Sequence, residues 1–314
     1  MFEDTIKSVA KGMKDCRYII FQPTTWCNYH CSYCIQGMQK DAKPSQEELR
    51  AKAEELRMAI NKIDHKVTKK YEKITFLGGE VAFYDMFEIL EPLISDKTIE
   101  ICMTSNGSAP TANYYAFSEK CAAKGINVHY VFSFHEEHTS PEAFLNKVKM
   151  MQKHFIIHKE LKSSIRCQIT VTDTNVDICR QFLSMAKKNG IFATPGLERK
   201  SRHFTNDYED IYHTREAKEL VTQYTRNENP SLIAEFTNGK IERIRREDLL
   251  SRCEGSILKT GKFICTDRFN TVRYQNGTIQ LNCKIKEDIM EEEDEVKCPY
   301  DTCSLCGSVN IKKA

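Results

Sequence analysis

Three cysteines near the start of the chain have types and spacing that could bind a metal cluster. Cys27, Cys31 and Cys34 lie in the segment TTWCNYHCSYC, residues 24–34, with the spacing C-x3-C-x2-C. Three thiolates can bind three corners of a four-iron cluster, and no further cysteine follows before Cys102. A structural site takes a fourth protein ligand, whereas catalysis needs one iron left open. The loop therefore predicts an iron–sulfur cluster with one open coordination position.

A zinc knuckle is the alternative reading of the same loop, with His30 as the fourth ligand. Zinc loops usually pair two Cys-x2-Cys or Cys/His halves, and this loop has no such pair. The spacing favours the iron–sulfur cluster.

The elements that must position this loop alternate between strand and helix from about Arg17 to Leu197. This alternation predicts an α/β fold of parallel strands joined by right-handed helical crossovers, with six strand–helix units. We expect strands at 18–22, 73–77, 98–104, 127–134, 164–172 and 191–194. Helix starts are indicated by Ser45 with Glu48, by Ser140 before Pro141, and by Thr174 with Asp177.

Beyond the alternating region the chain changes character twice. Residues 1–206 are predicted to form the α/β domain, and 207–254 a mostly helical connection with a helix over 208–226. Residues 255–314 contain five of the fourteen cysteines and too little apolar material for a core without a metal. We therefore expect a small cysteine-rich C-terminal domain.

The composition excludes several classes of protein. Of 314 residues, 40% are hydrophobic and 29% are charged, and no apolar run approaches the roughly 20 residues needed to span a bilayer. The net charge of +2 gives no field for attracting nucleic acid or anionic membranes, so a nucleic-acid partner is not expected. The N-terminus lacks the apolar stretch of a secretory signal, which predicts a cytoplasmic location.

The cysteine loop resembles the radical S-adenosylmethionine (SAM) superfamily, whose hallmark is C-x3-C-x-aromatic-C after the first strand of a partial (β/α)6 TIM-like barrel. Tyr33 occupies the aromatic position, and Gly78-Gly79-Glu80 matches the family's GGE motif after the second strand. The resemblance implies that this motif binds the amino group of SAM. The two glycines would let the backbone approach a ligand, and the carboxylate of Glu80 would accept from the ammonium.

The resemblance extends to two later strand ends. Thr104, Ser105 and Asn106 end the third strand in the manner of the family's polar strand end, and Ser133 stands where members contact the ribose or carboxylate of SAM. Ordinary strand-ending turns use the same residue types. In such a barrel, ligands gather at the carboxyl ends of the strands, where all these motifs lie.

What the resemblance implies about activity is radical chemistry. In the family, SAM binds the open iron, and an electron from the reduced cluster cleaves it to methionine and a 5′-deoxyadenosyl radical, which abstracts a hydrogen atom from the substrate. The protein supplies binding and orientation, while the cofactor supplies reactivity. The residues alone assign no catalytic acid or base.

Substrate-binding candidates come from the fifth and fourth strands. Period-2 alternation places Arg166, Gln168 and Thr170 on one face of the fifth strand, which we expect to face into the barrel. Arg166 could bind a carboxylate or phosphate, or could form an ion pair with a neighbouring Asp or Glu. The segment 135–138, His-Glu-Glu-His, could contact substrate, with His135 first among its residues, or could be a solvated loop.

The C-terminal cysteines have the pattern C-x11-G-x5-C followed by C-x4-C-x2-C. This resembles the twitch or SPASM-type extension of radical SAM enzymes and implies an auxiliary four-iron cluster. A hairpin over 268–281, with Asn276-Gly277 at its turn, would bring its first two cysteines together. The expected ligands, with Cys298 as a spare or substitute, are Cys265, Cys283, Cys303 and Cys306. A structural zinc ribbon is the alternative.

The remaining cysteines are interpreted as small buried hydrophobic residues: Cys16, Cys102, Cys121, Cys167, Cys179 and Cys253. A thiol that donates a hydrogen atom could be among them, and Cys253 is the least constrained candidate.

The leading hypothesis is an enzyme that abstracts hydrogen from a small polar substrate, giving oxidation or epimerisation, with electrons from a reductant such as flavodoxin or ferredoxin. The expectation of a small substrate rests on the barrel beginning within about twenty residues of Met1, without the leader-binding domain that peptide-modifying relatives often carry. Peptide modification is the alternative, and a zinc-binding or electron-carrier module is a remote one.

Overall fold

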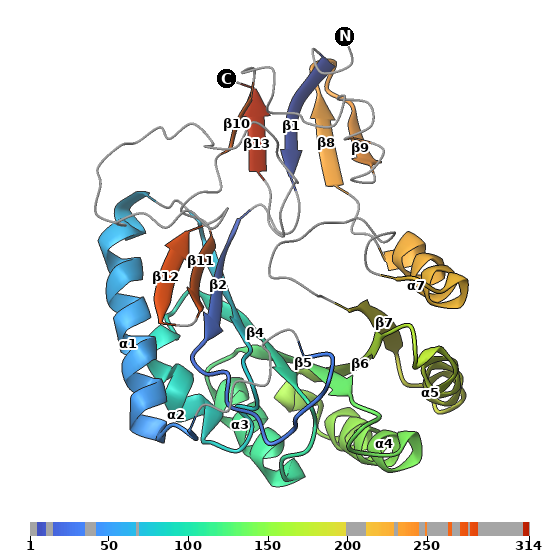
Figure 1. Ribbon diagram of the computed structural model, residues 1–314. Helices are drawn as coiled ribbons and strands as arrows, with labels where there is room; N and C mark the ends of the chain where they lie inside the picture. The colour runs from blue at the N-terminus through green and yellow to red at the C-terminus, as the bar shows by residue number, and fades with distance from the viewer. Residues whose placement is uncertain are drawn as a thin grey trace.

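The computed structural model describes residues 5–10, 15–34, 42–66, 69–198, 212–228, 232–244, 249, 263–265, 271–275, 277–281 and 310–313. The described strands form two sheets, one of eight strands and one of five. Figure 1 shows the larger sheet curved, with helices on its outer face, and the smaller sheet beyond one end of it, near both chain termini.

The six predicted parallel strands are confirmed, and they lie side by side in chain order. Their bounds are β2 Cys16–Gln22, β3 Tyr71–Phe76, β4 Thr98–Ser105, β5 Asn127–Phe134, β6 Ser163–Val171 and β7 Ala193–Leu197. The sequence had placed the last strand two residues too early, because the apolar Ile191 is buried just before β7 begins.

One helix follows each strand from β2 to β6, as expected for helical crossovers. These helices are α1 Gln46–Ile63, α2 Met86–Leu90, α3 Thr111–Ala123, α4 Pro141–Ile157 and α5 Val176–Lys188. Ser45 and Glu48 form the predicted capping box of α1, and Ser140 caps α4 ahead of Pro141. The prediction for Thr174 was wrong: α5 begins after Asn175, which makes no side-chain capping bond because its amide is bonded elsewhere.

Alternation along the strands separates two faces. On β6, Ile165, Cys167, Ile169 and Val171 are buried toward the helices, while the intervening residues are more exposed. Helix α1 buries the matching stripe of Leu49, Ala53, Leu56, Ile60 and Ile63. Burying a Leu or Ile side chain stabilises a protein by about 1.5–3 kcal/mol, so this packing fixes the strands against the helices.

The predicted C-terminal hairpin is present as β11 Thr271–Gln275 and β12 Thr278–Leu281. It extends the barrel sheet, because β11 pairs with β2 in parallel. Val272 and Tyr274 of β11 are buried, and the Tyr274 ring lies 5.7 Å from that of Phe21 on β2. The hairpin is therefore part of the same core as the barrel strands.

The five-stranded sheet has the order β10-β13-β1-β8-β9 and joins distant parts of the chain. Its strands are β1 Ile6–Ala10, β8 Leu232–Phe236, β9 Ile241–Ile244, β10 Phe263–Cys265 and β13 Asn310–Lys313. Helix α7, Arg215–Glu228, precedes β8, and the β8–β9 hairpin lies within 207–254, where a mostly helical connection was expected. The expected boundaries at 206 and 254 are therefore not the boundaries between the two sheets.

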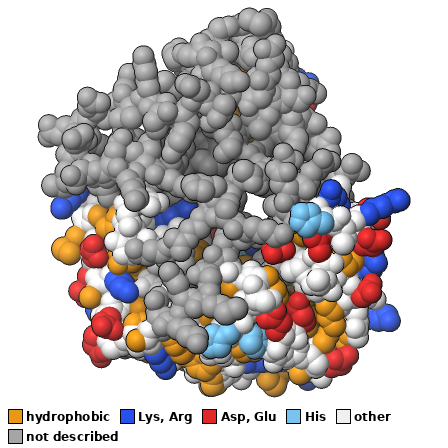
Figure 2. Space-filling model, in the orientation of Figure 1, with side chains coloured by type: hydrophobic (Ala, Val, Ile, Leu, Met, Phe, Trp, Pro, Cys, Tyr) orange, Lys and Arg blue, Asp and Glu red, His pale blue; other side chains and the backbone are white. Residues whose placement is uncertain are grey.

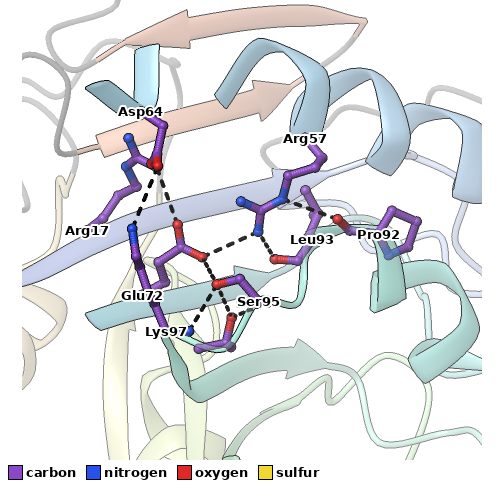
Figure 3. A network of polar contacts seen from close by, with 9 residues as sticks. Arg17, Arg57, Asp64, Glu72, Pro92, Leu93, Ser95 and Lys97 are labelled. Carbon is purple, nitrogen blue, oxygen red and sulfur yellow. Dashed lines mark hydrogen bonds and ion pairs between the residues drawn. The ribbon is translucent and has the colours of Figure 1, made fainter. Parts of the chain in front are cut away.

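A buried ion network ties the amino ends of β2 and β3 to α1 (Figure 3). Arg17 is 1% exposed and donates to Asp64 at 2.8 Å and to Glu72 at 3.3 Å. Arg57 of α1 also donates to Glu72, at 3.3 Å, and Ser95 donates to it at 2.7 Å. A buried charge is tolerated where it is paired and hydrogen-bonded, as Glu72 is here.

The described helices include none long and apolar enough to cross a membrane. Figure 2 shows charged side chains of both signs spread over the coloured part of one face, in agreement with the small net charge.

Candidate metal and cofactor site

The three predicted cluster ligands lie in the loop that follows β2. Cys27 is half-buried, Cys31 is 5% exposed and Cys34 is exposed, and all three are free thiols. The backbone N–H of Cys34 donates to the carbonyl of Cys31 at 3.2 Å, which closes a turn between the last two. The loop thus presents three thiols at the carboxyl end of a central strand.

Gly78 and Gly79 position the start of this loop. The Gly79 N–H donates to the Thr24 carbonyl at 3.0 Å, and the Glu80 N–H donates to the Trp26 carbonyl at 2.8 Å. A Cβ on Gly79 would lie 1.8 Å from the Trp26 oxygen, and one on Gly78 would lie 2.7 Å from the Thr24 oxygen. The glycines therefore allow a close approach of one backbone segment to another, here the segment that leads into Cys27.

Glu80 is bound by neighbouring groups of the protein. Its side chain is fully buried and accepts hydrogen bonds from the Ala82 N–H at 2.9 Å, the Asn106 N–H at 2.7 Å and the Ser105 hydroxyl at 3.0 Å. Burial raises the pKa of Glu80 to about 7, and the hydrogen bonds from Ala82 and Asn106 oppose this rise. Both oxygens are thus hydrogen-bonded within the protein, and the expectation that the carboxylate accepts from the ammonium of SAM stays a prediction.

Residues at the end of β4 face in different directions, some into the core and some toward the cysteine loop. Ser105, expected at the cofactor surface, is 2% exposed and donates to Glu80, and its contact with a cofactor stays a prediction. Asn106 faces the cysteine loop: its amide nitrogen lies 3.6 Å from the Cys27 sulfur and donates to Asn28 at 3.0 Å. Thr104 is half-buried on the inner face of the sheet. Ser108, which sequence reasoning missed, links Asn28 and Asn106.

The segment 135–138 after β5, named here the clasp segment, packs directly on the cysteine loop. The Ser32 N–H donates to Glu137 at 2.9 Å, and the Ser32 hydroxyl also donates to this carboxylate. The His30 N–H donates to His138 Nε2 at 3.3 Å, and the His138 ring stacks on Tyr29 with centroids 4.1 Å apart. The segment therefore packs on the cysteine loop, while the side chains of Glu137 and His138 are also exposed to solvent.

His135 and Glu136 of the clasp segment bind Tyr33. The Tyr33 hydroxyl donates to Glu136 at 2.9 Å and lies 3.1 Å from His135 Nδ1, and the two rings are stacked 5.9 Å apart. Asn175 donates to Glu136 at 2.5 Å, which connects the start of α5 to the loop. Tyr33, expected to contact SAM, thus has its hydroxyl bound to the protein.

The environment of Cys31 favours the neutral thiol in the absence of a metal. Its sulfur lies 3.2 Å from His135 Nδ1. Burial raises the pKa of Cys31 to about 12, with the nearby Cys34 and Glu137 adding to the rise. Burial also lowers the pKa of His135 to about 4. Binding a metal would replace the thiol proton, as it does at thiolate sites in general.

Polar residues of β5 and β6 lie on the inner face of the barrel sheet. Gln168 of β6 donates to the Ser133 hydroxyl of β5 at 2.7 Å. Arg166 is exposed on the same face and forms no ion pair or hydrogen bond with another described residue. The alternative reading of Arg166 as one half of an ion pair finds no partner in the described part of the chain.

The spacing of the potential ligand atoms bears on which metal the loop could bind. Within the described residues, the group of potential ligand atoms that lie within 4.8 Å of one another is Cys31, Glu137 and His138. Tetrahedral zinc, with sulfurs at about 2.3 Å, needs its ligands closer together than 4.8 Å. Cys27, Cys31, Cys34 and His30 are not gathered in this way, which disfavours a zinc knuckle, whereas a four-iron cluster holds its thiolates further apart.

The second cysteine set lies almost wholly outside the described residues. Cys265 ends β10, and the structure describes none of Cys283, Cys298, Cys303 and Cys306. Cys253 is also outside them. Of the other cysteines, Cys16, Cys121, Cys167 and Cys179 are buried as predicted, and Cys102 is half-buried on the inner face.

Sequence reasoning missed several residues that build the site. These residues are Asn28, Ser108 and Asn175, which have no motif around them and take their roles from partners distant in sequence. The one available signal was the polar run from Thr104 to Ser108 at a strand end.

Comparison with known proteins gives one family match. Residues 21–162 match the model described as the Radical SAM superfamily, and this range contains the three cysteines and the GGE segment. No curated protein matches the chain.

Several solved structures resemble this chain with low identity. SuiB from Streptococcus suis is 17% identical with a TM-score of 0.45, and the match covers 84% of this chain and 59% of SuiB. SuiB has been solved with S-adenosylmethionine and with its precursor peptide SuiA. The enzyme anSMEcpe, solved with AdoMet and the Cp18Cys peptide, is 15% identical with a TM-score of 0.45, over 82% of this chain and 71% of that one. This chain thus spans less than two thirds of SuiB.

Proposed function

We propose that this chain is a radical SAM enzyme that reductively cleaves SAM and abstracts a hydrogen atom from a small polar substrate. The observation that carries the proposal is the set of three free thiols, Cys27, Cys31 and Cys34, in one loop at the carboxyl end of β2. This loop lies within the range that matches the Radical SAM superfamily. The α/β architecture supports it, because ligands gather at the carboxyl ends of parallel strands.

The proposed cluster ligands are Cys27, Cys31 and Cys34, which leave one iron open for SAM. When bound, the cluster and SAM supply the electron transfer and the 5′-deoxyadenosyl radical, and the protein supplies binding and orientation. The backbone of Gly78 and Gly79 borders the loop and is proposed to face the amino group of SAM, since the Glu80 carboxylate is bound internally. Asn106 is proposed to orient the Cys27 sulfur, which its amide already contacts at 3.6 Å.

The proposed substrate site is the inner face of the barrel sheet. Arg166 offers an exposed guanidinium without a partner among the described residues, which suits a carboxylate or phosphate of the substrate. Ser133 and Gln168, joined at 2.7 Å, offer hydroxyl and amide groups for the ribose of SAM or for the substrate. A second cluster on Cys265, Cys283, Cys303 and Cys306 is proposed as an electron acceptor or donor, and the reaction class as oxidation or epimerisation.

The test is anaerobic reconstitution of the full chain, followed by counting iron and sulfide and assaying 5′-deoxyadenosine release from SAM with dithionite. We expect about eight irons in the parent and about four in Cys27→Ala/Cys31→Ala/Cys34→Ala, with nucleoside released by the parent alone. The matched control is Cys121→Ala, because Cys121 is a buried core thiol of α3 outside the loop. Zinc in place of iron, or a fully loaded parent that releases no nucleoside, would reject the proposal.

A further inference from the structure

The clasp segment holds the cysteine loop through contacts from all four of its residues. Each residue from 135 to 138 contacts the loop: His135 contacts Cys31, and the other three contact residues between the cysteines. Ser32 and Tyr33 are the two residues between Cys31 and Cys34. Both of them are bound by a carboxylate of the clasp segment, Ser32 by Glu137 and Tyr33 by Glu136.

The clasp segment is itself anchored to the sheet. Asn175 donates to Glu136 and also to the Thr170 carbonyl at 3.0 Å, while its side-chain oxygen accepts from the Thr172 N–H at 2.8 Å. The end of β6 therefore fixes Asn175, which fixes Glu136, which fixes Tyr33. This chain of bonds transfers the rigidity of the sheet to the turn that carries Cys31 and Cys34.

The same carboxylates bring negative charge to the thiols. A Glu137 oxygen lies within 4.8 Å of the Cys31 sulfur. Of the two carboxylates, Glu137 has the larger electrostatic effect on that thiol. No described Lys or Arg forms an ion pair with Glu136 or Glu137, so their charge is not cancelled by one. Net charge and hydrogen bonding near an iron–sulfur cluster are among the factors that set its reduction potential.

We infer that Glu137 is a positioning residue of the cluster site: it fixes the loop through Ser32, and its charge holds the cluster at a lower reduction potential. The inference rests on the proposed function, since it assumes that the three thiols bind a cluster. Negative charge disfavours the added electron, so a low potential follows from its proximity. A low potential makes the reduced cluster a stronger electron donor, as cleavage of SAM requires.

Two variants separate the two roles of Glu137. Glu137→Gln keeps an oxygen that can accept from the Ser32 N–H but removes the charge. Glu137→Ala removes both. The matched control is Glu142→Gln, which removes one exposed charge from the first turn of α4, on the same connection but without a contact to the cysteine loop among the described residues.

The first measurement is the amide exchange of Ser32, followed by NMR in the iron-free protein. We expect Glu137→Ala to exchange about tenfold faster than the parent, because a hydrogen bond to a charged group is lost. Glu137→Gln should lie between the two, and Glu142→Gln should match the parent. Equal exchange in Glu137→Ala and the parent would overturn the inference, and the circular dichroism spectrum checks that the variant is folded.

The second measurement is the midpoint potential of the cluster in reconstituted protein, followed by electron paramagnetic resonance. To isolate the SAM-binding cluster, the titration is read from the signal that changes on addition of SAM. We expect Glu137→Gln to raise the ratio of reduced to oxidised cluster at a given potential about tenfold, a shift in midpoint potential of about 59 mV for a one-electron couple. An unchanged potential at full iron content would overturn the inference. A parent that binds no iron would instead reject the proposed function, while the exchange of Ser32 would still report on the contact.

Discussion

Strand β3 has a buried carboxylate near each end, and the protein satisfies the two in different ways. Glu72, at the second position of the strand, accepts from the two cations Arg17 and Arg57 and from Ser95 (Figure 3). Glu80, four residues beyond the last strand residue, accepts from neutral groups: two backbone N–H groups and the Ser105 hydroxyl. Both side chains are at most 3% exposed.

The two ends of β3 therefore serve different purposes: the amino end stabilises the fold, and the carboxyl end sets the geometry of the site. At the amino end, ion pairs connect two strands to α1, and no thiol of the cysteine loop is involved. At the carboxyl end, neutral donors join the GGE segment to the end of β4, whose next residue contacts Cys27. Neutral donors fix this geometry without placing a cation beside the thiols. This division agrees with the general rule that the carboxyl end of a parallel barrel bears function and the amino end stability.

The largest effect is expected from Glu72→Ala. Arg17 is 1% exposed, and two of its side-chain nitrogens have no hydrogen-bond partner among the described residues. Removing the Glu72 carboxylate leaves Asp64 as the one partner of Arg17 in the described part of the chain. Breaking a buried ion pair in this way destabilises a protein by about 3–5 kcal/mol. Urea unfolding followed by circular dichroism would measure the loss in the free energy of unfolding.

The matched control for this prediction is Glu54→Ala, which removes the partner of an exposed i,i+4 ion pair with Arg50. Such a pair contributes about 0.3–0.5 kcal/mol. Similar losses in Glu72→Ala and Glu54→Ala would show that the network does not stabilise the amino end. Loss of iron binding in a folded Glu72→Ala protein would contradict the separation of the two ends.

Gly79→Ala is expected to have its main effect at the site. The added Cβ would lie 1.8 Å from the Trp26 oxygen, so the segment leading into Cys27 must move. Overpacking of this kind costs about 1–3 kcal/mol, and the displaced loop should retain little iron after reconstitution. Iron content per chain and unfolding in urea are the two measurements.

Gly196→Ala is the control for Gly79→Ala, because its Cβ would meet only the Ile169 oxygen at an ordinary 3.7 Å. It should keep the iron content of the parent. Full iron loading in Gly79→Ala would show that the glycine does not position the loop.

The sequence predicted the barrel because each strand and helix carries a local signal. The six strands follow from alternation and β-branched residues, and Ser45 and Ser140 are caps that need only neighbouring residues. The five-stranded sheet was not predicted. It pairs β1 with β13, near opposite ends of the chain, and short strands such as β9 have no periodicity that specifies a distant partner.

At the site, the sequence singled out residues by type and spacing, but it did not indicate which way their side chains face. Glu80 and Ser105 belong to the expected motifs, yet they face each other in the core because the turn after β3 directs the carboxylate inward. The clasp segment was singled out, but its contact with the cysteine loop joins residues about 105 positions apart, such as Ser32 and Glu137. A contact at this separation leaves no mark in one sequence. The auxiliary cluster stays a prediction.

Glu80→Gln tests the carboxyl end of β3, where neutral donors bind the carboxylate. The amide keeps the size of the side chain, but its NH2 group must face one of the N–H donors, Ala82 or Asn106. Leaving a buried donor without an acceptor costs about 1–3 kcal/mol. The variant should therefore be less stable than the parent at about pH 5, where the raised pKa keeps this carboxyl mostly protonated in the folded state.

The difference in stability between the parent and Glu80→Gln should then shrink as the pH rises. Burial raises the pKa of Glu80 to about 7, whereas an unfolded glutamate titrates near 4.3. Between these values the folded chain holds a proton that the unfolded chain has lost, so the stability contributed by this group falls as pH rises. Urea unfolding of both proteins from about pH 5 to about pH 8 measures the difference, and a constant difference would contradict the raised pKa.

The smallest effect is expected from Glu100→Gln, on the inner face between the two ends. The Glu100 carboxylate pairs with His129 at 3.3 Å and with Lys73 at 2.9 Å. The hydrogen bond from His129 lowers the pKa of Glu100 to about 2, with Lys73 acting in the same direction. Because the folded pKa lies below the unfolded value of about 4.3, this stabilisation is present above that value and is lost as pH falls toward 2.

Both partners of Glu100 are partly exposed, so solvent screening limits the loss in Glu100→Gln to about 1 kcal/mol at neutral pH. The parent should approach the variant in stability as the pH is lowered from about 5 to about 2.5, while Glu142→Gln should follow the parent throughout. If the free energy of unfolding falls with pH in parallel for the parent and Glu100→Gln, the Glu100 carboxylate is not stabilised by its ion pairs. If the curves converge and the iron content of Glu100→Gln is unchanged, the inner face contributes its own ion pairs to stability, independently of the loop that binds the cluster. The division between the two ends of β3 would then be a property of the strand ends rather than of every charged residue in the barrel.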